Sequence, residues 1–377
     1  MRSLIYFFEF RFSLLQANTD GLLDRNMALL CNLLARGVCD RVYLFSYNPK
    51  DQAYLQQCHQ QGRLPEGVLA LTAPEFATTK LGAIVYSVIG PLLQRRKFQQ
   101  ASVLHTHQVS GAWTGILAKL LYHTPLLFRC GYPLSVRFKQ EKKPLNYAIT
   151  RLLEKTLMYM ADHVGVTSRP MQQYYGQMRE GTQVTLMPNY VDLSVYSPVT
   201  TYDIKRPILF IGRLVDVKNI ENMILACSRL NLALHIYGKG PLEASLRKLA
   251  EDCKADVSFM GVVANTELAK LHHNYSIFIT CSTREGLPKA VVEAMASGLI
   301  VVGTKTDGVL ELIKDGETGH YIDGYDADAI ATKLDWVRKN FSPKVGQAAS
   351  RYVTRHYSLD HATEVTENIL NQIGKFE

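Results

Sequence analysis

The sequence is poor in cysteine, and its cysteines are not arranged as a framework. The 377 residues contain seven cysteines, which is an odd number, and no two of them form a C-x-x-C pair. This scatter argues against a set of disulfides and against a structural zinc site built on paired cysteines. We therefore expect free thiols and a reducing, cytoplasmic compartment.

The chain also lacks a hydrophobic run long enough to cross a bilayer. Its longest strongly apolar stretch, residues 81–93, contains two glycines and a proline. It is shorter than the roughly 20 residues that a membrane-spanning helix needs. The apolar segment at residues 4–8 has no small-residue cleavage site behind it, which predicts a first strand rather than a secretory signal. We find no repeat of short period, charged tail or low-complexity segment.

What is present indicates a globular chain of two domains with unequal charge. Hydrophobic residues make up 47% and charged residues 20% of the sequence, and 377 residues exceed the roughly 100–200 that one domain usually takes. Residues 1–200 contain 21 Lys and Arg and 12 Asp and Glu, whereas residues 201–377 contain 21 and 22. All of the net positive charge of +8 therefore comes from the first half, which suggests that the two domains have different partners.

Short β-rich runs alternate with longer segments of helical periodicity. Most of the β-rich runs are continuously apolar, which is typical of parallel strands covered by helices on both faces of a sheet. The pattern predicts an α/β fold of two Rossmann-like, doubly wound domains that face a cleft. Prolines and threonines near residues 197–206 mark the boundary between them. We expect an N-terminal domain at 1–198, a second domain at 199–358, and a C-terminal helix at 359–377 that packs back towards the first. The predicted strands cover residues 4–10, 41–46, 101–105, 125–129, 163–167, 207–211, 233–237, 257–260, 277–281 and 300–303.

The most informative segment follows the strand predicted at residues 277–281. It reads E-G-L-P-K-A-V-V-E-A-M-A-S-G from Glu285 to Gly298. Pro288 suits the first turn of a helix, and Gly298 suits its C-terminal end. The N-terminus of a helix presents free amides and favours phosphate. Glu285 precedes this helix, and Glu293 lies inside it. The two carboxylates can bind a ligand that has hydroxyl groups at two separate places and a negative group between them, as a nucleotide sugar has.

Glu293 also has a simpler interpretation as a surface carboxylate. Lys289 lies four residues before it, so the two residues can pair on a solvated face of the helix. Lysine on the N-terminal side of glutamate is the weaker orientation for such a pair. Small apolar residues follow Glu293, which favours a packed face.

Two cations and a glycine turn follow earlier strands of the same half. Gly212 and Arg213 come directly after one predicted strand, and Lys218 follows a few residues later. Arg213 and Lys218 can hold a diphosphate, the first as a planar fork and the second as a point charge. Taken alone, the two residues are better explained as ordinary surface cations. The segment Y-G-K-G-P at 237–241 lacks the third glycine of a dinucleotide fingerprint, so it predicts a tight turn at Gly240 and argues against an NAD site.

Together these motifs resemble the family 4 retaining glycosyltransferases of the GT-B fold. The order and spacing of five pieces carry the resemblance, which covers the second half closely and the first half more loosely. It implies an N-terminal acceptor domain and a C-terminal donor domain that binds a nucleoside-diphosphate sugar. The pieces are I-G-R-L from Ile211 with Lys218-Asn219, Y-G-K-G-P from Tyr237, F-M-G from Phe259, E-x7-E from Glu285 to Glu293, and M-A-S-G from Met295.

The resemblance implies roles for individual residues of the donor site. It places Arg213 and Lys218 on the donor diphosphate, Glu285 on hydroxyls of the transferred sugar and Glu293 on the ribose. It places His107, the second histidine of an H-x-H motif at the end of a first-half strand, near the anomeric carbon. The catalytic set that it implies is therefore His107, Glu285, Arg213 and Lys218. The further donor contacts that it implies are Gly21, Gly212, Gly240, Gly261, Val262, Gly286, Leu287 and Pro288.

Neither candidate metal motif in the sequence supports a metal site. His105 and His107 could be two ligands at a strand end, but no Cys, Asp or Glu cluster accompanies them, and a buried, hydrogen-bonded histidine is the simpler interpretation of His105. Asp326-Ala327-Asp328 is the only D-x-D segment and opens a predicted helix, which favours capping. We expect no metal, as the resemblance also implies.

The chain departs from the family pattern at three places. Asn18-Thr19-Asp20-Gly21 stands where many members have a glycine pair, and we expect that Gly21 still allows close approach to the donor. Arg129 and Tyr132 lie in a segment where many members have T-x-H, and both acceptor binding and a structural role stay open for them. Tyr190 occupies the glycine position of the family's P-N-G-V-D.

The positive charge of the first half is concentrated around residues 95–155. Basic residues are interleaved there with apolar ones, which is compatible with contact to an anionic membrane surface. A solvated helix face is the alternative. No zinc finger, RNA-recognition signature or basic recognition helix is present, so we expect no nucleic acid partner.

With the resemblance, the sequence predicts a metal-independent retaining glycosyltransferase of the hexosyltransferase type. It would move a sugar from a UDP- or GDP-linked donor to a hydroxyl of a glycan or lipid-linked glycan, with no separate cofactor. The expected setting is polysaccharide, lipopolysaccharide or lipid-linked glycan synthesis, in the cytoplasm or peripheral on the inner face of the cytoplasmic membrane. Two alternatives stay open: a nucleotide-sugar epimerase of the same fold, and a non-catalytic nucleotide-sugar-binding protein.

Overall fold

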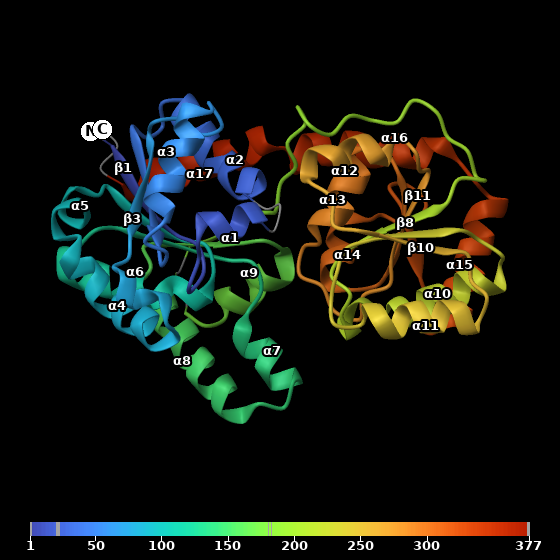
Figure 1. Ribbon diagram of the computed structural model, residues 1–377, viewed down its shortest axis with the longest axis horizontal. Helices are drawn as coiled ribbons and strands as arrows, with labels where there is room; N and C mark the ends of the chain where they lie inside the picture. The colour runs from blue at the N-terminus through green and yellow to red at the C-terminus, as the bar shows by residue number, and fades with distance from the viewer. Residues whose placement is uncertain (1, 20–22, 180, 182, 375–377) are drawn as a thin grey trace. The chain divides into compact units, whose positions relative to one another are not determined.

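The chain folds into two compact units. The computed structural model describes residues 2–19, 23–179, 181 and 183–374. Unit 1 comprises residues 1–188 and 362–377, and unit 2 comprises residues 189–361 (Figure 1). The first division falls before the predicted 198/199 because residues 189–198 are tied into unit 2. Val191 pairs with Ser358, and the Asn189 amide donates to the carbonyl of Leu287.

The sheet of unit 1 has seven parallel strands in the order β3-β2-β1-β4-β5-β6-β7. The continuous apolar runs of the sequence form its centre, where every residue of β1, β4, β5 and β6 is buried. Such strands need helices on both faces to cover them. The strands are β1 (Ser3–Phe7), β2 (Arg41–Ser46), β3 (Val68–Thr72), β4 (Val103–Thr106), β5 (Leu126–Cys130), β6 (His163–Val166) and β7 (Val184–Leu186).

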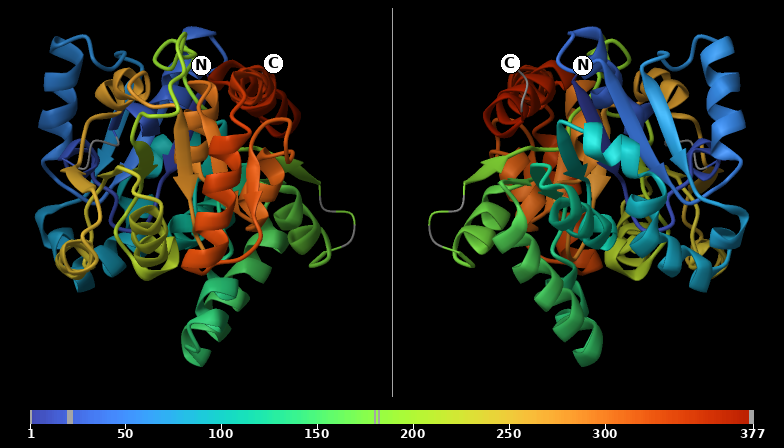
Figure 2. Two further views of the ribbon diagram at one scale, coloured as in Figure 1. Left: turned by 90° about the vertical axis from the view of Figure 1, so that its right-hand side faces the viewer. Right: turned by 90° about the vertical axis from the view of Figure 1, so that its left-hand side faces the viewer.

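Helices cover both faces of this sheet (Figure 1). α2, α3 and α17 lie on one face, where the amide of Asn32 on α2 donates to Thr363 on α17. α4, α6, α8 and α9 cover the other face and close one large apolar core with the strands. The hairpin of α7 and α8 projects away from the sheet (Figure 2). The helices are α1 (Leu14–Thr19), α2 (Leu23–Ala35), α3 (Asp51–Gln60), α4 (Lys80–Leu93), α5 (Arg95–Gln100), α6 (Ala112–Tyr122), α7 (Leu134–Gln140), α8 (Pro144–Met160), α9 (Arg169–Gly176) and α17 (Leu359–Ile373).

Unit 2 repeats the architecture with six parallel strands in the order β10-β9-β8-β11-β12-β13. One core lies under α10, α11 and α15, and the other lies under α12, α13, α14 and α16. The strands are β8 (Ile208–Ile211), β9 (Leu234–Tyr237), β10 (Val257–Gly261), β11 (Ile277–Thr280), β12 (Ile300–Thr304) and β13 (His320–Ile322). The helices are α10 (Ile220–Arg229), α11 (Glu243–Asp252), α12 (Asn265–His272), α13 (Lys289–Ala296), α14 (Asp307–Leu312), α15 (Ala327–Lys339) and α16 (Pro343–His356).

Both sheets are doubly wound, so each has a point where the strand order reverses. In unit 1 this point lies between β1 and β4, and in unit 2 it lies between β8 and β11. Ligands of open α/β sheets bind outside the carboxyl ends of the strands at such a point. None of the described helices has the length and apolar composition that crossing a membrane requires. All seven cysteines are free thiols.

Candidate active site

Lys218 and Glu285 meet at the reversal point of unit 2. Lys218 is the last residue of the short 3-10 helix Asp216–Lys218, which follows the carboxyl end of β8. Glu285 lies in the loop that follows the carboxyl end of β11. Because β8 and β11 are neighbours, these segments leave the sheet side by side. The Nζ of Lys218 lies 2.6 Å from an Oε of Glu285, and the side chains are only 17% and 19% exposed. A cation and a carboxylate are thus held together, mostly out of water, where a ligand is expected.

Arg213 adds a second cation to the same end of the sheet. It follows Gly212 directly after β8, and its side chain is exposed. It forms no ion pair with any residue that the structure describes, so its guanidinium is available to an anion. Arg213 and Lys218 therefore differ: one is open to solvent, and the other already holds a carboxylate.

The glycines behind β9 are explained by packing within the protein. Gly238 has φ of +142°, and a Cβ there would lie 1.9 Å from the carbonyl oxygen of Gly212. A Cβ on Gly240 would lie 2.3 Å from the carbonyl oxygen of Leu214. The tight turn is therefore as predicted, and the backbone that it approaches is that of the turn behind β8. This packing fixes the segment that carries Arg213.

The loop between β11 and α13 is held from three sides. The amide of Thr283 donates to the carbonyl of Val217 at 2.9 Å. The side-chain amide of Asn189 donates to the carbonyl of Leu287 at 2.6 Å. The backbone of Gly308 donates to the carbonyl of Glu285 at 3.3 Å. These contacts fix the loop that carries Glu285, Gly286, Leu287 and Pro288.

Asn189 and Gly308 were not predicted as site residues. A Cβ on Gly308 would lie 1.3 Å from the carbonyl oxygen of Gly286, so only glycine fits against this loop. In the sequence, Gly308 could have been identified as a glycine that follows the strand β12. Asn189 could have been identified by its position in the P-N-Y-V-D segment. Neither motif by itself names the loop that these residues contact.

α13 begins where the loop ends and carries Glu293. Pro288 occupies the N-cap rather than the predicted first turn, and the helix runs from Lys289 to Ala296. Glu293 is only 4% exposed, so its carboxylate is not on a solvated face. The Nζ of Lys289 lies 5.2 Å from the centre of the Tyr190 ring. The departure from the family pattern at Tyr190 therefore places an aromatic ring against the first residue of α13.

Gly261 and Val262 lie at the end of β10. Gly261 has φ of +72°, and its carbonyl accepts from the amide of Gly238 at 2.7 Å. Val262 is 53% exposed. This exposed segment is tied to the glycine turn behind β9.

His107 of unit 1 lies behind β4 and is held by two side chains. The hydroxyl of Tyr6 lies 2.8 Å from its Nδ1, and a guanidinium nitrogen of Arg129 lies 3.4 Å from the same atom. These two contacts orient the His107 ring at the carboxyl end of β4.

Arg129 is buried and contacts neighbouring residues of unit 1. It is 4% exposed and also donates to the carbonyl of Met187 at 3.1 Å. Burial, and secondly the charge of Arg129, lower the pKa of the fully buried His105 to about 3. Tyr132 lies partly exposed between β5 and α7. Gly21 lies outside the described residues.

The predicted capping role of Asp326 is confirmed. Its carboxylate accepts from the amide of Ala329 at 2.9 Å at the start of α15, and Asp328 pairs with Arg229. Among the residues that the structure describes, no three His, Cys, Asp or Glu side chains gather as ligands for a metal ion.

Two family models match the chain, one on each half. Residues 26–195 match the model "Glycosyltransferase Family 4", and residues 199–351 match "Glycosyl transferases group 1". The GDP-mannose-dependent alpha-(1-6)-phosphatidylinositol monomannoside mannosyltransferase of Mycobacterium tuberculosis is 33% identical over 175 residues, which cover 41% of this chain and 45% of that protein. The alpha-maltose-1-phosphate synthase of Mycolicibacterium smegmatis is 24% identical over 312 residues, which cover 73% and 80%. A putative colanic acid biosynthesis glycosyltransferase of Salmonella typhimurium is 31% identical over 137 residues, which cover 33% and 34%.

Solved structures share the fold over nearly the whole chain. The sucrose-phosphate synthase of Thermosynechococcus elongatus superposes with a TM-score of 0.79 and 17% identity, covering 99% of both chains. The HepE protein of Anabaena in complex with UDP-glucose superposes with a TM-score of 0.74 and 16% identity, covering 99% of this chain and 100% of that one. The matches to the mannosyltransferase and the colanic acid enzyme span less than half of those relatives. Each half of the chain therefore matches a glycosyltransferase family model, and the shared architecture shows that the chain has the GT-B fold.

Proposed function

We propose that the protein transfers a hexosyl unit from a nucleoside-diphosphate sugar to an acceptor hydroxyl, with retention of anomeric configuration. The observation that carries this proposal is the contact between Lys218 and Glu285 at the reversal point of unit 2. A cation binds a phosphate, and a carboxylate accepts hydrogen bonds from sugar hydroxyls. The ammonium of Lys218 and the carboxylate of Glu285 are adjacent to each other near the N-terminus of α13. A nucleotide sugar carries both functions next to each other.

The diphosphate is the part of the donor that the charges of unit 2 fit best. Arg213 offers an exposed guanidinium, Lys218 offers an ammonium, and the first amides of α13 point out of its N-terminal end. These groups stabilise the negative charge that develops on the departing diphosphate, with no metal required. HepE binds UDP-glucose and the mycobacterial relative uses GDP-mannose, which supports a UDP- or GDP-linked donor.

The two glutamates bind hydroxyl groups on different parts of the donor. We assign Glu285 to hydroxyls of the transferred sugar, because it contacts Lys218, the cation that we assign to the phosphate. We assign the buried Glu293 to the ribose, because it lies one turn into α13 behind the same loop. A carboxylate that accepts hydrogen bonds from a diol fixes the orientation of the ring, which is a large part of what this reaction needs.

In the proposed step, the bond between the anomeric carbon and the phosphate oxygen breaks and the acceptor oxygen bonds to the same carbon. Attack takes place on the face that the phosphate leaves, and the acceptor proton passes to the departing phosphate oxygen. We assign His107 a role near the anomeric carbon, as the resemblance to the family implies. Positioning and charge stabilisation supply the catalysis, without a cofactor.

The acceptor that we propose is a glycan or a lipid-linked glycan of a surface polysaccharide or lipopolysaccharide. The relatives that support this class are named for a phosphatidylinositol monomannoside and for colanic acid biosynthesis. Tyr132 lies behind β5, at the same edge of the sheet as His107, and is our candidate acceptor contact.

The test is transfer from a panel of radiolabelled UDP- and GDP-sugars to membrane glycan extracts, in the presence and absence of EDTA. Glu285→Ala and Arg213→Ala should each lower the rate by at least about tenfold, which corresponds to about 1.4 kcal/mol. Lys248→Ala and Glu251→Ala on the exposed face of α11 serve as matched controls. Wild-type rates from both site variants would contradict the site. A new sugar formed from donor alone would indicate an epimerase, and donor binding without turnover would indicate a binding protein.

A further inference from the structure

The helix α4 of unit 1 presents its large aliphatic side chains to solvent. Apart from Lys80 at its start, every exposed residue of α4 is apolar, and Leu81 is 73% exposed. The face that packs on the protein is made mainly of small residues. A Cβ on Gly82 would lie 1.8 Å from the carbonyl oxygen of Phe76, and one on Gly90 would lie 2.6 Å from the Phe45 ring. The exposed residues of α4 are Leu81, Ile84, Val85, Val88, Leu92 and Leu93.

A second apolar stripe runs along α8 of the same unit. Leu145, Ile149, Leu152 and Tyr159 lie at helical spacing on its exposed face, and Leu145 and Leu152 are 71% and 68% exposed. α6 packs against both α4 and α8 and adds the exposed Leu120 and Leu121. We call the exposed apolar residues of α4, α6 and α8 the apolar surface. Soluble proteins rarely expose so many large apolar side chains together unless a partner covers them.

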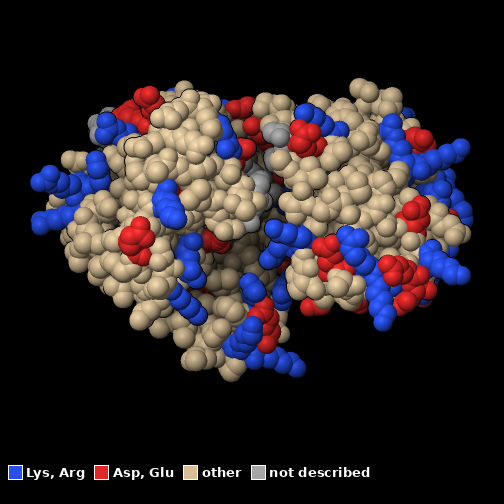
Figure 3. All heavy atoms as spheres, in the orientation of Figure 1, with Lys and Arg blue, Asp and Glu red and all other residues tan. Residues whose placement is uncertain are grey.

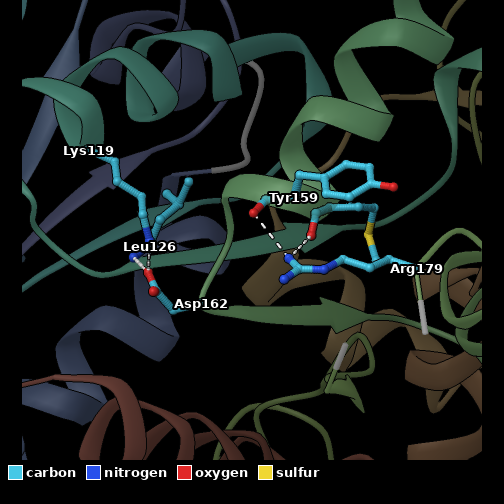
Figure 4. A network of polar contacts seen from close by, with 6 residues as sticks. Lys119, Leu126, Tyr159, Asp162 and Arg179 are labelled. Atoms are coloured by element: carbon cyan, nitrogen blue, oxygen red, sulfur yellow. Dashed lines mark hydrogen bonds and ion pairs between the residues drawn. The ribbon is translucent and has the colours of Figure 1, made fainter. Parts of the chain in front are cut away.

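The helices that carry this surface are firmly attached to unit 1. Arg179 donates to the carbonyls of Met158 and Tyr159 at the C-terminal end of α8, and its guanidinium lies 5.4 Å from the centre of the Tyr159 ring (Figure 4). The buried Glu154 accepts from the backbone and hydroxyl of Ser135 and so ties α8 to α7. The exposure is therefore a property of the packed fold.

The region that contains the apolar surface is strongly basic. Residues 81–160 include 11 Lys and Arg but only two Asp and Glu. Glu154 is buried, and Glu141 pairs with Arg137 and Lys143. Asp162, which follows this region in the sequence, forms an ion pair with Lys119 (Figure 4). Exposed cations that pair with no described residue are Lys80, Arg95, Arg96, Lys139, Lys142 and Lys155.

Five of these six cations lie at the ends of the apolar stripes, and the sixth, Lys155, lies within α8 between Leu152 and Tyr159. Lys80, Arg95 and Arg96 bracket α4, and Lys139 and Lys142 precede α8. Figure 3 shows one side of unit 1, where the surface over α4 carries few charged side chains. Apolar side chains bounded by cations match a phospholipid surface, in which acyl chains lie beneath anionic headgroups.

We propose that unit 1 docks on an anionic phospholipid bilayer through the apolar surface. Side chains of α4 and α8 enter the acyl boundary, and the cations at their ends meet the headgroups. A second copy of the chain fits less well, because a two-fold contact places the same cations against one another. This proposal rests on residues of unit 1 alone and is separate from donor binding in unit 2.

The experiment measures co-sedimentation of the full chain with vesicles of phosphatidylcholine, alone or mixed with phosphatidylglycerol. One variant replaces Leu81, Val88 and Leu92 of α4 by serine, and a second replaces Arg95, Arg96 and Lys142 by serine. The matched controls are Trp336→Ser, an exposed apolar residue of unit 2, and a Lys248→Ser, Lys344→Ser variant. Thermal melting and nucleoside-diphosphate affinity check that each variant is folded.

The wild type should bind the mixed vesicles and lose affinity when NaCl is raised from about 0.1 M to about 1 M, since salt screens the headgroups. The charge variant should bind mixed vesicles about a hundredfold more weakly. The α4 variant should lose at least as much, and the controls should bind as the wild type does. A wild type that stays in the supernatant, or an α4 variant that binds equally well, would overturn the proposal. So would a wild-type dimer in light scattering that the α4 variant turns into a monomer.

Discussion

Removal of the Glu285 carboxylate should strengthen the binding of a nucleoside diphosphate that carries no sugar. The ammonium of Lys218 already donates to Glu285 at 2.6 Å, with both side chains less than one-fifth exposed. A diphosphate that takes this ammonium must first weaken a charge-assisted hydrogen bond worth about 1.5–3 kcal/mol. Glu285→Ala frees the cation and removes a negative charge next to the phosphate. We expect the Kd for UDP or GDP to fall by about tenfold, which corresponds to about 1.4 kcal/mol.

Isothermal titration calorimetry with UDP and with GDP measures this change. Lys218→Met should raise the Kd by at least about tenfold, because the phosphate loses a charged donor. In the Lys218→Met background, Glu285→Ala should improve binding by less than tenfold, since only the repulsion between the carboxylate and the diphosphate is left to remove. Glu251→Ala removes the same charge from the exposed face of α11 and should leave the Kd unchanged.

The same variant should behave in the opposite way towards the complete donor. Sugar transfer by Glu285→Ala should fall, because the residue that we assign to the sugar hydroxyls is gone. Tighter diphosphate binding combined with slower transfer would indicate that Glu285 pairs with Lys218 in the absence of the donor and binds the sugar hydroxyls when the donor is present. Weaker binding of UDP and GDP by Glu285→Ala would refute this reasoning, because the carboxylate would then support the diphosphate rather than compete for its cation.

Three further predictions follow from the residues around the two sites. Asn189→Ala removes the hydrogen bond to Leu287 and should lower kcat by about tenfold with little change in melting temperature. Gly308→Ala places a Cβ at 1.3 Å from the Gly286 carbonyl oxygen, so melting temperature and diphosphate affinity should both fall. The pKa of His105 is about 3 in the fold, so unfolded chains bind the extra proton as pH falls below about 6.5. His105 should contribute about 1.4 kcal/mol per pH unit to the fall of stability in that window, measured by urea unfolding, and His105→Asn should lower the slope by that amount.

Sequence patterns predicted ten of the thirteen strands that the structure describes, including every strand that is completely buried. Every run of continuous apolar residues that we predicted as a strand became one, because such runs fit a sheet covered on both faces. The partly buried strand β3 was missed although the less buried β10 was predicted, and β7 and β13 were missed because each has only three residues. A three-residue edge strand is defined by its neighbour more than by its own sequence.

The site was predicted as separate motifs, and the contacts between them come from the fold. Spacing identified Lys218 and Glu285 but not their ion pair, which depends on β8 and β11 being neighbours. It identified a tight turn at Gly240, whose close contact is with the backbone at Leu214. Gly308 was missed because the loop that it contacts is more than 20 residues away in sequence and close only in space.

Helical periodicity also did not reveal the apolar surface. The run at residues 81–93 contains almost no polar residue, so the sequence alone does not say which side of α4 faces the core. The structure resolves this through sterics. Gly82 and Gly90 fit where backbone and a ring approach α4 closely, and bulkier side chains do not. The leucines and valines are therefore excluded from the packed face, and their exposure is the result.

The charge difference between the halves implies that docking and donor binding can be abolished separately. The second half, which holds most of unit 2, is nearly neutral, since residues 201–377 contain 21 Lys and Arg and 22 Asp and Glu, and its cation Lys218 is paired with Glu285. The excess positive charge of unit 1 lies in residues 81–160. Lys218→Met should therefore bind anionic vesicles normally, and the α4 serine variant should bind nucleoside diphosphates normally. If the natural acceptor is embedded in a membrane, the α4 variant should lose transfer to that acceptor in vesicles but keep it in detergent. Equal loss in both would mean that α4 affects the reaction itself and not access to the membrane.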